Sequence, residues 1–273
     1  MKQDRGLAKP LLLLVTPLIA SSSVLAALPS YAASLALSEG AVEFTRFSQN
    51  PSEVVSDADI DTFEIARDGK VDAVAAADAV FVAASPTASN FSLSRVLGEG
   101  TDYLGLAQST AQVIGNFAVD AGTSFSFDFT ANLNLAASID YPLLESASAS
   151  GDISLALLDT DTQSIIDFFS LQGNLSFQDN NDFVALDTSE NIVLSQPVTT
   201  YRFGGNEEFA TVSVQGSLQR SFANNTNLTL VEVKRNQARV QAPEPSTTLA
   251  LLFLYGTFGV ALKGKRNTMN PVS

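Results

Sequence analysis

Apolar and polar residues alternate with a period of two through much of the interior of this chain. In the segment "FSFDFTANLNL", residues 125–135, phenylalanine, alanine and leucine occupy the odd positions, and serine, aspartate, threonine and asparagine occupy the even ones. Successive side chains of a strand point to opposite faces, so this pattern predicts an antiparallel strand with one buried face. The segment "GDISLALLD", residues 151–159, repeats the pattern and buries Ile153, Leu155 and Leu157.

Turn signals separate these short apolar segments and predict the fold class. Asn224 and Asn225 lie between "FATVSVQGSLQRSF" and "NLTLVEV" and predict a hairpin turn. Many short strands joined by such turns are typical of an all-β protein, here an antiparallel β-sandwich or jelly-roll-like domain. No Pro- or Gly-rich linker divides residues 33–242, which favours one domain. The first third is ambiguous, and the alanine-rich residues 71–84 are assigned to a strand because their neighbours are strands.

The two ends of the chain have a different pattern. Lys2, Arg5 and Lys9 precede the apolar run "LLLLVTPLIA", and small residues follow it in "SYA". This order predicts a signal peptide over residues 1–32, with a mature chain that begins near Ala33.

The C-terminal residues 246–262 contain no charged side chain, and Lys263, Lys265 and Arg266 follow directly. As a helix this run has a length of roughly 25 Å, close to the thickness of a bilayer core. The three basic residues are expected to stop transfer and to remain on the cytoplasmic side of the inner membrane, followed by the short tail 267–273. Residues 33–242 are then an exported ectodomain.

The motif that precedes this predicted transmembrane helix is Pro243, Glu244 and Pro245. Together with the helix and the basic cluster, it resembles the PEP-CTERM sorting signal, over residues 243–266. The resemblance implies that exosortase, a membrane-embedded transpeptidase-like enzyme of exopolysaccharide-producing Gram-negative bacteria, recognises and processes the tail. The expected route is an inner-membrane intermediate, then the cell surface or the extracellular matrix.

Composition excludes several classes of site. The chain of 273 residues has no histidine and no cysteine, so it contains no Ser-His-Asp or Cys-His nucleophilic site. The net charge is −14, and no basic residue occurs between Arg95 and Arg202. Such a surface repels phosphate, so nucleic acid is not an expected partner. Anionic polysaccharide would also be repelled, unless a divalent cation bridges it to the protein.

One acidic segment has spacing similar to that of a calcium-binding loop. Asp57, Asp59, Asp61 and Asp68 in "DADIDTFEIARD" are spaced as in an EF-hand, but Thr62 occupies the glycine position and Asp68 replaces the glutamate. The alternative is an ordinary solvated segment. Asp and Asn residues at 159–161 and 178–182 have the same two interpretations, and turn formation is favoured there.

These observations favour an exported, non-enzymatic surface or extracellular-matrix protein with no catalytic residues and no cofactor. Its expected partners are exosortase, the inner membrane during sorting, and extracellular polysaccharide. An alternative is a calcium-dependent carbohydrate-binding module. An enzyme that acts on polysaccharide is a third option, since a pair of carboxylates suffices for glycoside hydrolysis. The absence of tryptophan weakens both the carbohydrate-binding hypothesis and the enzyme hypothesis. Only Tyr103, Tyr141 and Tyr201 are then considered for stacking on a sugar.

Overall fold

The computed structural model describes residues 33–142, 144–178 and 181–243. These residues lie in one compact unit. The predicted signal peptide, the predicted helix 246–262 and its basic cluster lie outside the described residues, as do Glu244 and Pro245.

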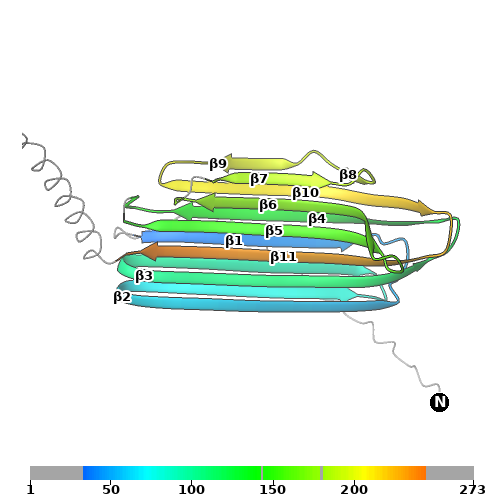
Figure 1. The fold of residues 1–273 in the computed structure, drawn as a ribbon, viewed down its shortest axis with the longest axis horizontal. Helices are drawn as coiled ribbons and strands as arrows, with labels where there is room; N and C mark the ends of the chain where they lie inside the picture. The colour runs from blue at the N-terminus through cyan, green and yellow to red at the C-terminus, as the bar shows by residue number, and fades with distance from the viewer. Residues whose placement is uncertain (1–32, 143, 179–180, 244–273) are drawn as a thin grey trace, which may run out of the picture. The chain divides into compact units, whose positions relative to one another are not determined.

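Every regular element in the described residues is a β-strand, which confirms the all-β prediction. The strands are β1 (Ala33–Thr45), β2 (Glu53–Val82), β3 (Thr87–Val119), β4 (Thr123–Ser138), β5 (Ser146–Asp159), β6 (Ser164–Ser176), β7 (Phe183–Thr188), β8 (Ile192–Leu194), β9 (Val198–Arg202), β10 (Glu207–Phe222) and β11 (Thr226–Ala242). All pairs are antiparallel, and the order is β7-β6-β5-β11-β3-β1-β4-β10-β8, with β2 on β3 and β9 on β10 (Figure 1).

The long strand β3 belongs to both halves of this sheet. Its first part, residues 88–99, pairs with β1, and its second part, residues 103–119, pairs with β11. β2 follows β3 along both parts and forms the outer edge. We call the strands from β3 through β1 to β8 and β9 the β1 limb, and those from β3 through β11 to β7 the β11 limb.

A cluster of glycines forms the corner between the two limbs. Gly100 has φ +89°, a conformation that residues with a Cβ rarely adopt. At Gly98, a Cβ would overlap the ring of Tyr103, which covers the corner from the second part of β3. The absence of side chains at these two positions lets β3 bend while its pairing with β2 continues on both sides.

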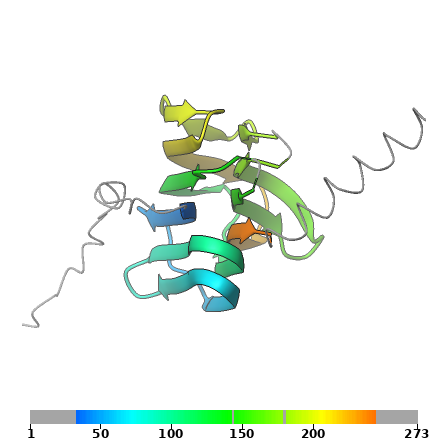
Figure 2. The same cartoon turned by 90° about the vertical axis from the view of Figure 1, so that its left-hand side faces the viewer.

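The two limbs face one another across the core. β1 and β4 of one limb contact β11, β5 and β6 of the other, although these strands are not paired. The view along the strands places β1 (blue) and β11 (orange) on opposite sides of the interior, with β2 and β3 beneath them (Figure 2). A curled antiparallel sheet of this kind is consistent with the predicted sandwich.

The core confirms the inward faces predicted from the period-two segments. In β4 the six odd residues from Phe125 to Leu135 are at most 3% exposed. Ile153, Leu155 and Leu157 of β5 are also buried. Phenylalanines from both limbs meet at one end of the core, where Phe127 packs against Phe44, Phe47, Phe125 and Phe129 with ring centroids 5.5–6.4 Å apart.

The predicted hairpin at Asn224 and Asn225 is wrong in its pairing, although a turn lies there. β10 pairs with β4, and β11 pairs with β3 and β5, so the turn carries the chain from one limb to the other. Asn225 stabilises this crossing because its side-chain oxygen accepts a hydrogen bond from Ala121 N at 2.8 Å. A crossing and a hairpin use the same turn residues, and the core contacts of the strands decide between them. The alanine-rich segment is a strand up to Val82, as predicted.

Candidate binding groove

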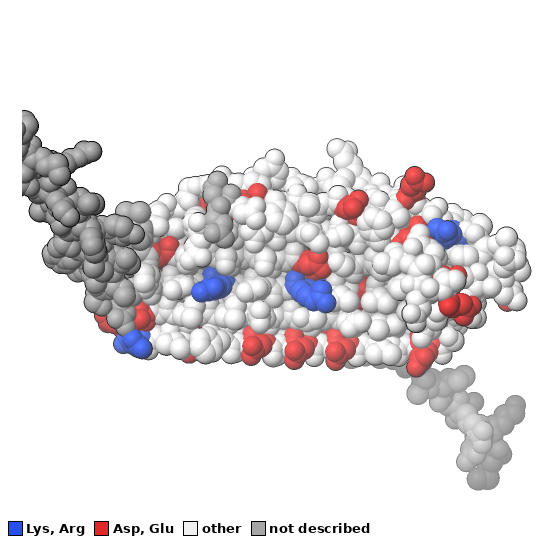
Figure 3. All heavy atoms as spheres, in the orientation of Figure 1, with Lys and Arg blue, Asp and Glu red and all other residues white. Residues whose placement is uncertain are grey.

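An open groove with a volume of about 800 Å³ lies on the outer face of the β11 limb. Its lining comes from β2, β3, β11, β5, β6 and the start of β7. The outer face is polar because the inward positions of these strands hold the core, which leaves serine, threonine, asparagine, glutamine, arginine and aspartate at the alternate positions. In Figure 3 basic side chains stand near the middle of this face, and acidic ones line its lower edge over β2.

The strand register aligns these polar side chains in two rows across the sheet. The first row comprises Asp59, Thr110, Arg235, Asp152 and Gln172, and the second comprises Asp61, Gln108, Gln237, Ser150 and Asn174. Neighbours within a row are about 4.8 Å apart, so each row crosses roughly 19 Å of sheet. The rows are about 7 Å apart, since two residues separate them along each strand. Phe183, opposite Asn174, ends the second row with a partly exposed ring.

Two arginines of β11 stand in the floor of this groove. Arg235 and Arg239 are exposed and point from the same face of the strand, with Gln237 between them. Arg239 donates a hydrogen bond to Gln241 at 3.0 Å. Within the described residues, Arg235 makes no hydrogen bond or ion pair. Its guanidinium therefore presents all of its donors to the groove.

The carboxylate opposite Arg235 is already engaged. Asp152 accepts hydrogen bonds from Ser154 at 2.7 Å and from Gln172 at 2.9 Å. Gln172 lies on β6, so this carboxylate is held toward the side of β5 that faces away from β11. The arrangement can bind a ligand that carries hydroxyl groups, because amide, hydroxyl and carboxylate groups supply donors and acceptors in alternation.

The calcium candidates lie on a strand and not in a loop. Asp57, Asp59 and Asp61 occupy alternate positions of β2 and share one face, and two of them form the rim of the groove. Asp68 lies at the corner, where its carboxylate accepts from Thr101 at 3.2 Å. Carboxylates two residues apart on a strand are about 7 Å apart at the backbone, so these four residues do not converge on one point. Among the described residues, no group of three or more acidic side chains could hold a metal ion.

The other acidic turns agree with the turn interpretation. Asp159 accepts hydrogen bonds from the backbone N of Asp161 and Thr162 at 3.0 and 2.9 Å. These bonds, chiefly the one from Thr162, lower the pKa of Asp159. Asp182 likewise accepts from Ser176 N at 2.8 Å.

None of the three tyrosines considered for sugar stacking lines the groove. Tyr103 is 2% exposed and its hydroxyl pairs with that of Ser34 at 2.6 Å, whereas Tyr141 and Tyr201 are exposed elsewhere. Pro243 of the predicted sorting motif is exposed directly after β11. Sequence reasoning missed the groove itself, since its residues come from six strands and only the register aligns them.

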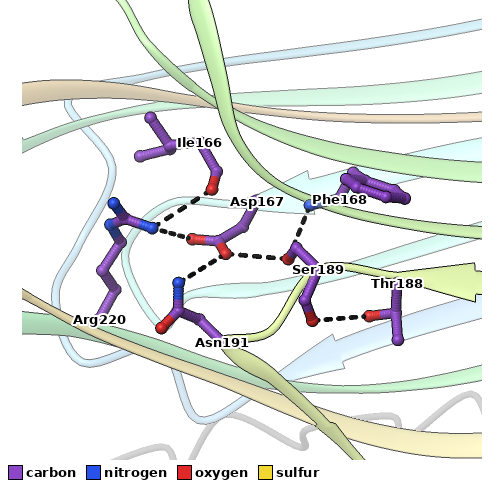
Figure 4. Close-up of polar contacts among 7 residues, drawn as sticks. All are labelled: Ile166, Asp167, Phe168, Thr188, Ser189, Asn191 and Arg220. Atoms are coloured by element: carbon purple, nitrogen blue, oxygen red, sulfur yellow. Dashed lines mark hydrogen bonds and ion pairs between the residues drawn. The ribbon is translucent and has the colours of Figure 1, made fainter.

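A buried carboxylate on β6 links the two limbs through a hydrogen-bonded ion pair with β10 (Figure 4). Asp167 of β6 is fully buried and accepts from Arg220 of β10 at 3.0 Å, from Ser189 at 2.9 Å and from Asn191 at 2.9 Å. Arg220 also donates to the carbonyl of Ile166 at 3.2 Å. Both carboxylate oxygens thus accept hydrogen bonds from protein donors, and the network ties β6 of one limb to β10 of the other.

A second buried polar group lies between the limbs beneath the groove floor. Glu232 and Lys234 of β11 are fully buried, and Lys234 Nζ donates to the carbonyl of Asn90 at 2.6 Å and to Glu232 at 3.4 Å. Asn90 Nδ2 donates to the other oxygen of Glu232. Next along the strand, Asn236 accepts from Ser38 at 2.6 Å.

Burial governs the titration of this pair. Desolvation raises the pKa of Glu232, and the positive charge of Lys234 opposes that effect. Desolvation also lowers the pKa of Lys234 from 10.5 to about 8, against the opposing charge of Glu232. Both shifts disfavour the charged forms, as expected when two ions leave water.

These shifts predict a rise in stability at alkaline pH. Between pH 8 and 10.5 the unfolded chain keeps the proton of Lys234 while the folded chain loses it, so the free energy of unfolding increases with pH. Chemical denaturation of the full-length chain, purified in mild detergent, at pH 7.5 and 9.5 should show this increase. The double variant Glu232→Gln/Lys234→Met should lack it, and an equal rise in both proteins would contradict the assignment.

Comparisons with known proteins do not identify a family for this chain. No protein-family model, curated protein or solved structure matches the chain. In the part of the chain that the structure describes, no helix has the length and apolar character needed to cross a membrane.

Proposed function

We propose that this protein is an exported, non-enzymatic surface or extracellular-matrix protein whose β-sandwich ectodomain binds extracellular polysaccharide. The observation that supports binding is the groove, in which two rows of polar side chains cross five strands. An open polar surface of this width suits a polymer with many hydroxyl groups, and Phe183 offers an apolar contact at one end. The PEP-CTERM resemblance of residues 243–266 supports sorting by exosortase.

The first strand supports the proposed removal of residues 1–32. β1 begins at Ala33, and its backbone N donates a hydrogen bond to the carboxylate of Asp140 at 3.0 Å. Cleavage before Ala33 would turn that nitrogen into an ammonium group beside a carboxylate, which strengthens the bond. Processing at this position therefore preserves the end of the sheet.

The sorting proposal predicts a change in location when the motif is altered. In a host that has exosortase, Pro243→Ala/Pro245→Ala should leave full-length protein in the inner membrane, while the wild type reaches the extracellular fraction. Proline holds the preceding residue out of a helix, and alanine lets the helix extend over the processing peptide. Immunoblots of membrane and extracellular fractions measure the difference.

The control is Pro197→Ala, which changes an exposed proline between β8 and β9. It should be processed like the wild type. Deletion of all residues after Ala242 should release soluble protein, since the proposed anchor is then removed. Equal processing of the double-alanine variant and the wild type would refute sorting through this motif.

A calcium-dependent carbohydrate-binding module is the second candidate. Asp59 and Asp61 favour it, because both lie at the rim of the groove, where a cation could bridge them to an anionic ligand. Polysaccharide binding that disappears with EDTA and returns with calcium would select this candidate. Binding that is unchanged by EDTA would select the calcium-independent protein.

A further inference from the structure

We infer that the groove takes an acidic polysaccharide chain lying along β11 and β5, with Arg235 and Arg239 as the groups that bind its carboxylates. This inference rests on the proposed function and names its ligand class. It reverses the expectation from net charge, which was that anionic polysaccharide would be repelled without a bridging cation.

The free guanidinium of Arg235 is the first observation that supports an acidic ligand. A planar guanidinium matches a carboxylate with two parallel hydrogen bonds, and such charge-assisted bonds are stronger than bonds to hydroxyl groups. Arg235 has no ion pair within the described residues, although Asp152 lies directly opposite it on β5. Asp152 accepts hydrogen bonds from Ser154 and Gln172 and not from Arg235. The guanidinium of Arg235 is therefore available to a carboxylate of the ligand.

The position of the second arginine sets the direction of the ligand. Arg235 and Arg239 are four residues apart on one strand, a separation of about 14 Å along β11. One chain can reach both arginines only if it runs along the strand. Along that path Gln237 and the hydroxyls of Ser148 and Ser150 offer further donors from the same floor.

The charge distribution confines the ligand to this path. Asp59 and Asp61 on β2 form an acidic rim, separated from β11 by β3. A carboxylate-bearing chain is repelled at this rim and at Asp152 on β5, and it is attracted at the arginines of β11 between them. A polymer with a carboxylate on each sugar can meet two arginines in several registers, as a matrix polymer requires.

Affinity electrophoresis of the full-length chain in mild detergent tests this inference. The probes are polygalacturonate and alginate, each compared with its carboxyl-reduced form. The wild type should be retarded by the acidic polymers and much less by the reduced ones. Arg235→Gln and Arg239→Gln should each weaken binding about tenfold, and the double variant about a hundredfold, because sites this far apart act independently.

Arg202→Gln is the matched control, since Arg202 is exposed on β9 and pairs with Glu207 at 2.7 Å, outside the groove. It should bind like the wild type. Equal retardation by acidic and reduced polymers, with no effect of the groove arginines, overturns the inference and leaves the proposed polysaccharide binding intact. No retardation by any of the four polymers overturns both.

Discussion

Phe127→Ala is expected to lower the free energy of unfolding by about 3–5 kcal/mol. The ring of Phe127 is 1% exposed and lies 5.6 Å from Phe44 in an edge-on arrangement and 5.5 Å from Phe47. Its removal leaves a cavity that rings on neighbouring strands cannot fill, because strand pairing fixes their backbones.

Thermal unfolding of the full-length chain, followed by far-UV circular dichroism, measures this loss. A domain of this size should lose roughly 10 °C in melting temperature. The variant Phe127→Asp should not fold at all, since a carboxylate without partners would be placed in the core. The control Phe63→Ala removes a ring that is 46% exposed on β2 and should change stability little. If Phe127→Ala melts within two degrees of the wild type, the proposed central role of the phenylalanine cluster is wrong.

Lys234→Met is expected to lower the free energy of unfolding by about 3–5 kcal/mol, because it removes the hydrogen bonds that the lysine nitrogen, charged or neutral, donates to the buried carbonyl of Asn90 and the carboxylate of Glu232. Methionine is similar in length to lysine and retains the packing of the aliphatic stem. The loss should shrink toward acidic pH, since burial raises the pKa of Glu232 and its protonated form no longer needs a cation.

The double variant Glu232→Gln/Lys234→Met separates charge from packing. It should unfold close to the wild type, since replacing both partners of a buried pair is often neutral. Denaturant unfolding at pH 7 and pH 5 provides the comparison. If Lys234→Met alone is as stable as the wild type at pH 7, then Glu232 is not an uncompensated buried charge.

The period-two pattern was sufficient for the local structure of the central strands. Residues 125–135 alternate without exception, so their inward face could be predicted, and the structure buries it. The turn at Asn224 and Asn225 was also predictable in position. Its partners were not, because a hairpin and a crossing between limbs use the same turn residues, and only the cores of the two limbs distinguish them.

In β11 the local pattern alone does not indicate the buried face. In "LTLVEVKRN" the valines suggest that Val231 and Val233 face inward, but the structure buries Glu232 and Lys234. Leu228 and Leu230 before them, and Ala238 and Val240 after them, are inward at even positions. A strand without a bulge cannot change face, so the burial of both ends forces the charged residues between them into the core.

Some features of the candidate site follow from the sequence, and others follow only from the tertiary structure. The sequence by itself determined the all-β class, the inward faces of β4 and β5, and the polar character of the alternate positions, because these depend on side-chain alternation within one strand. Only the tertiary structure decided that Arg235, Thr110 and Asp152 lie side by side, and that Asp59 and Asp61 lie on one face of β2 at the rim of the groove. Cross-strand register joins segments more than a hundred residues apart, and it is set by how the two limbs fill their shared core, which no local pattern encodes.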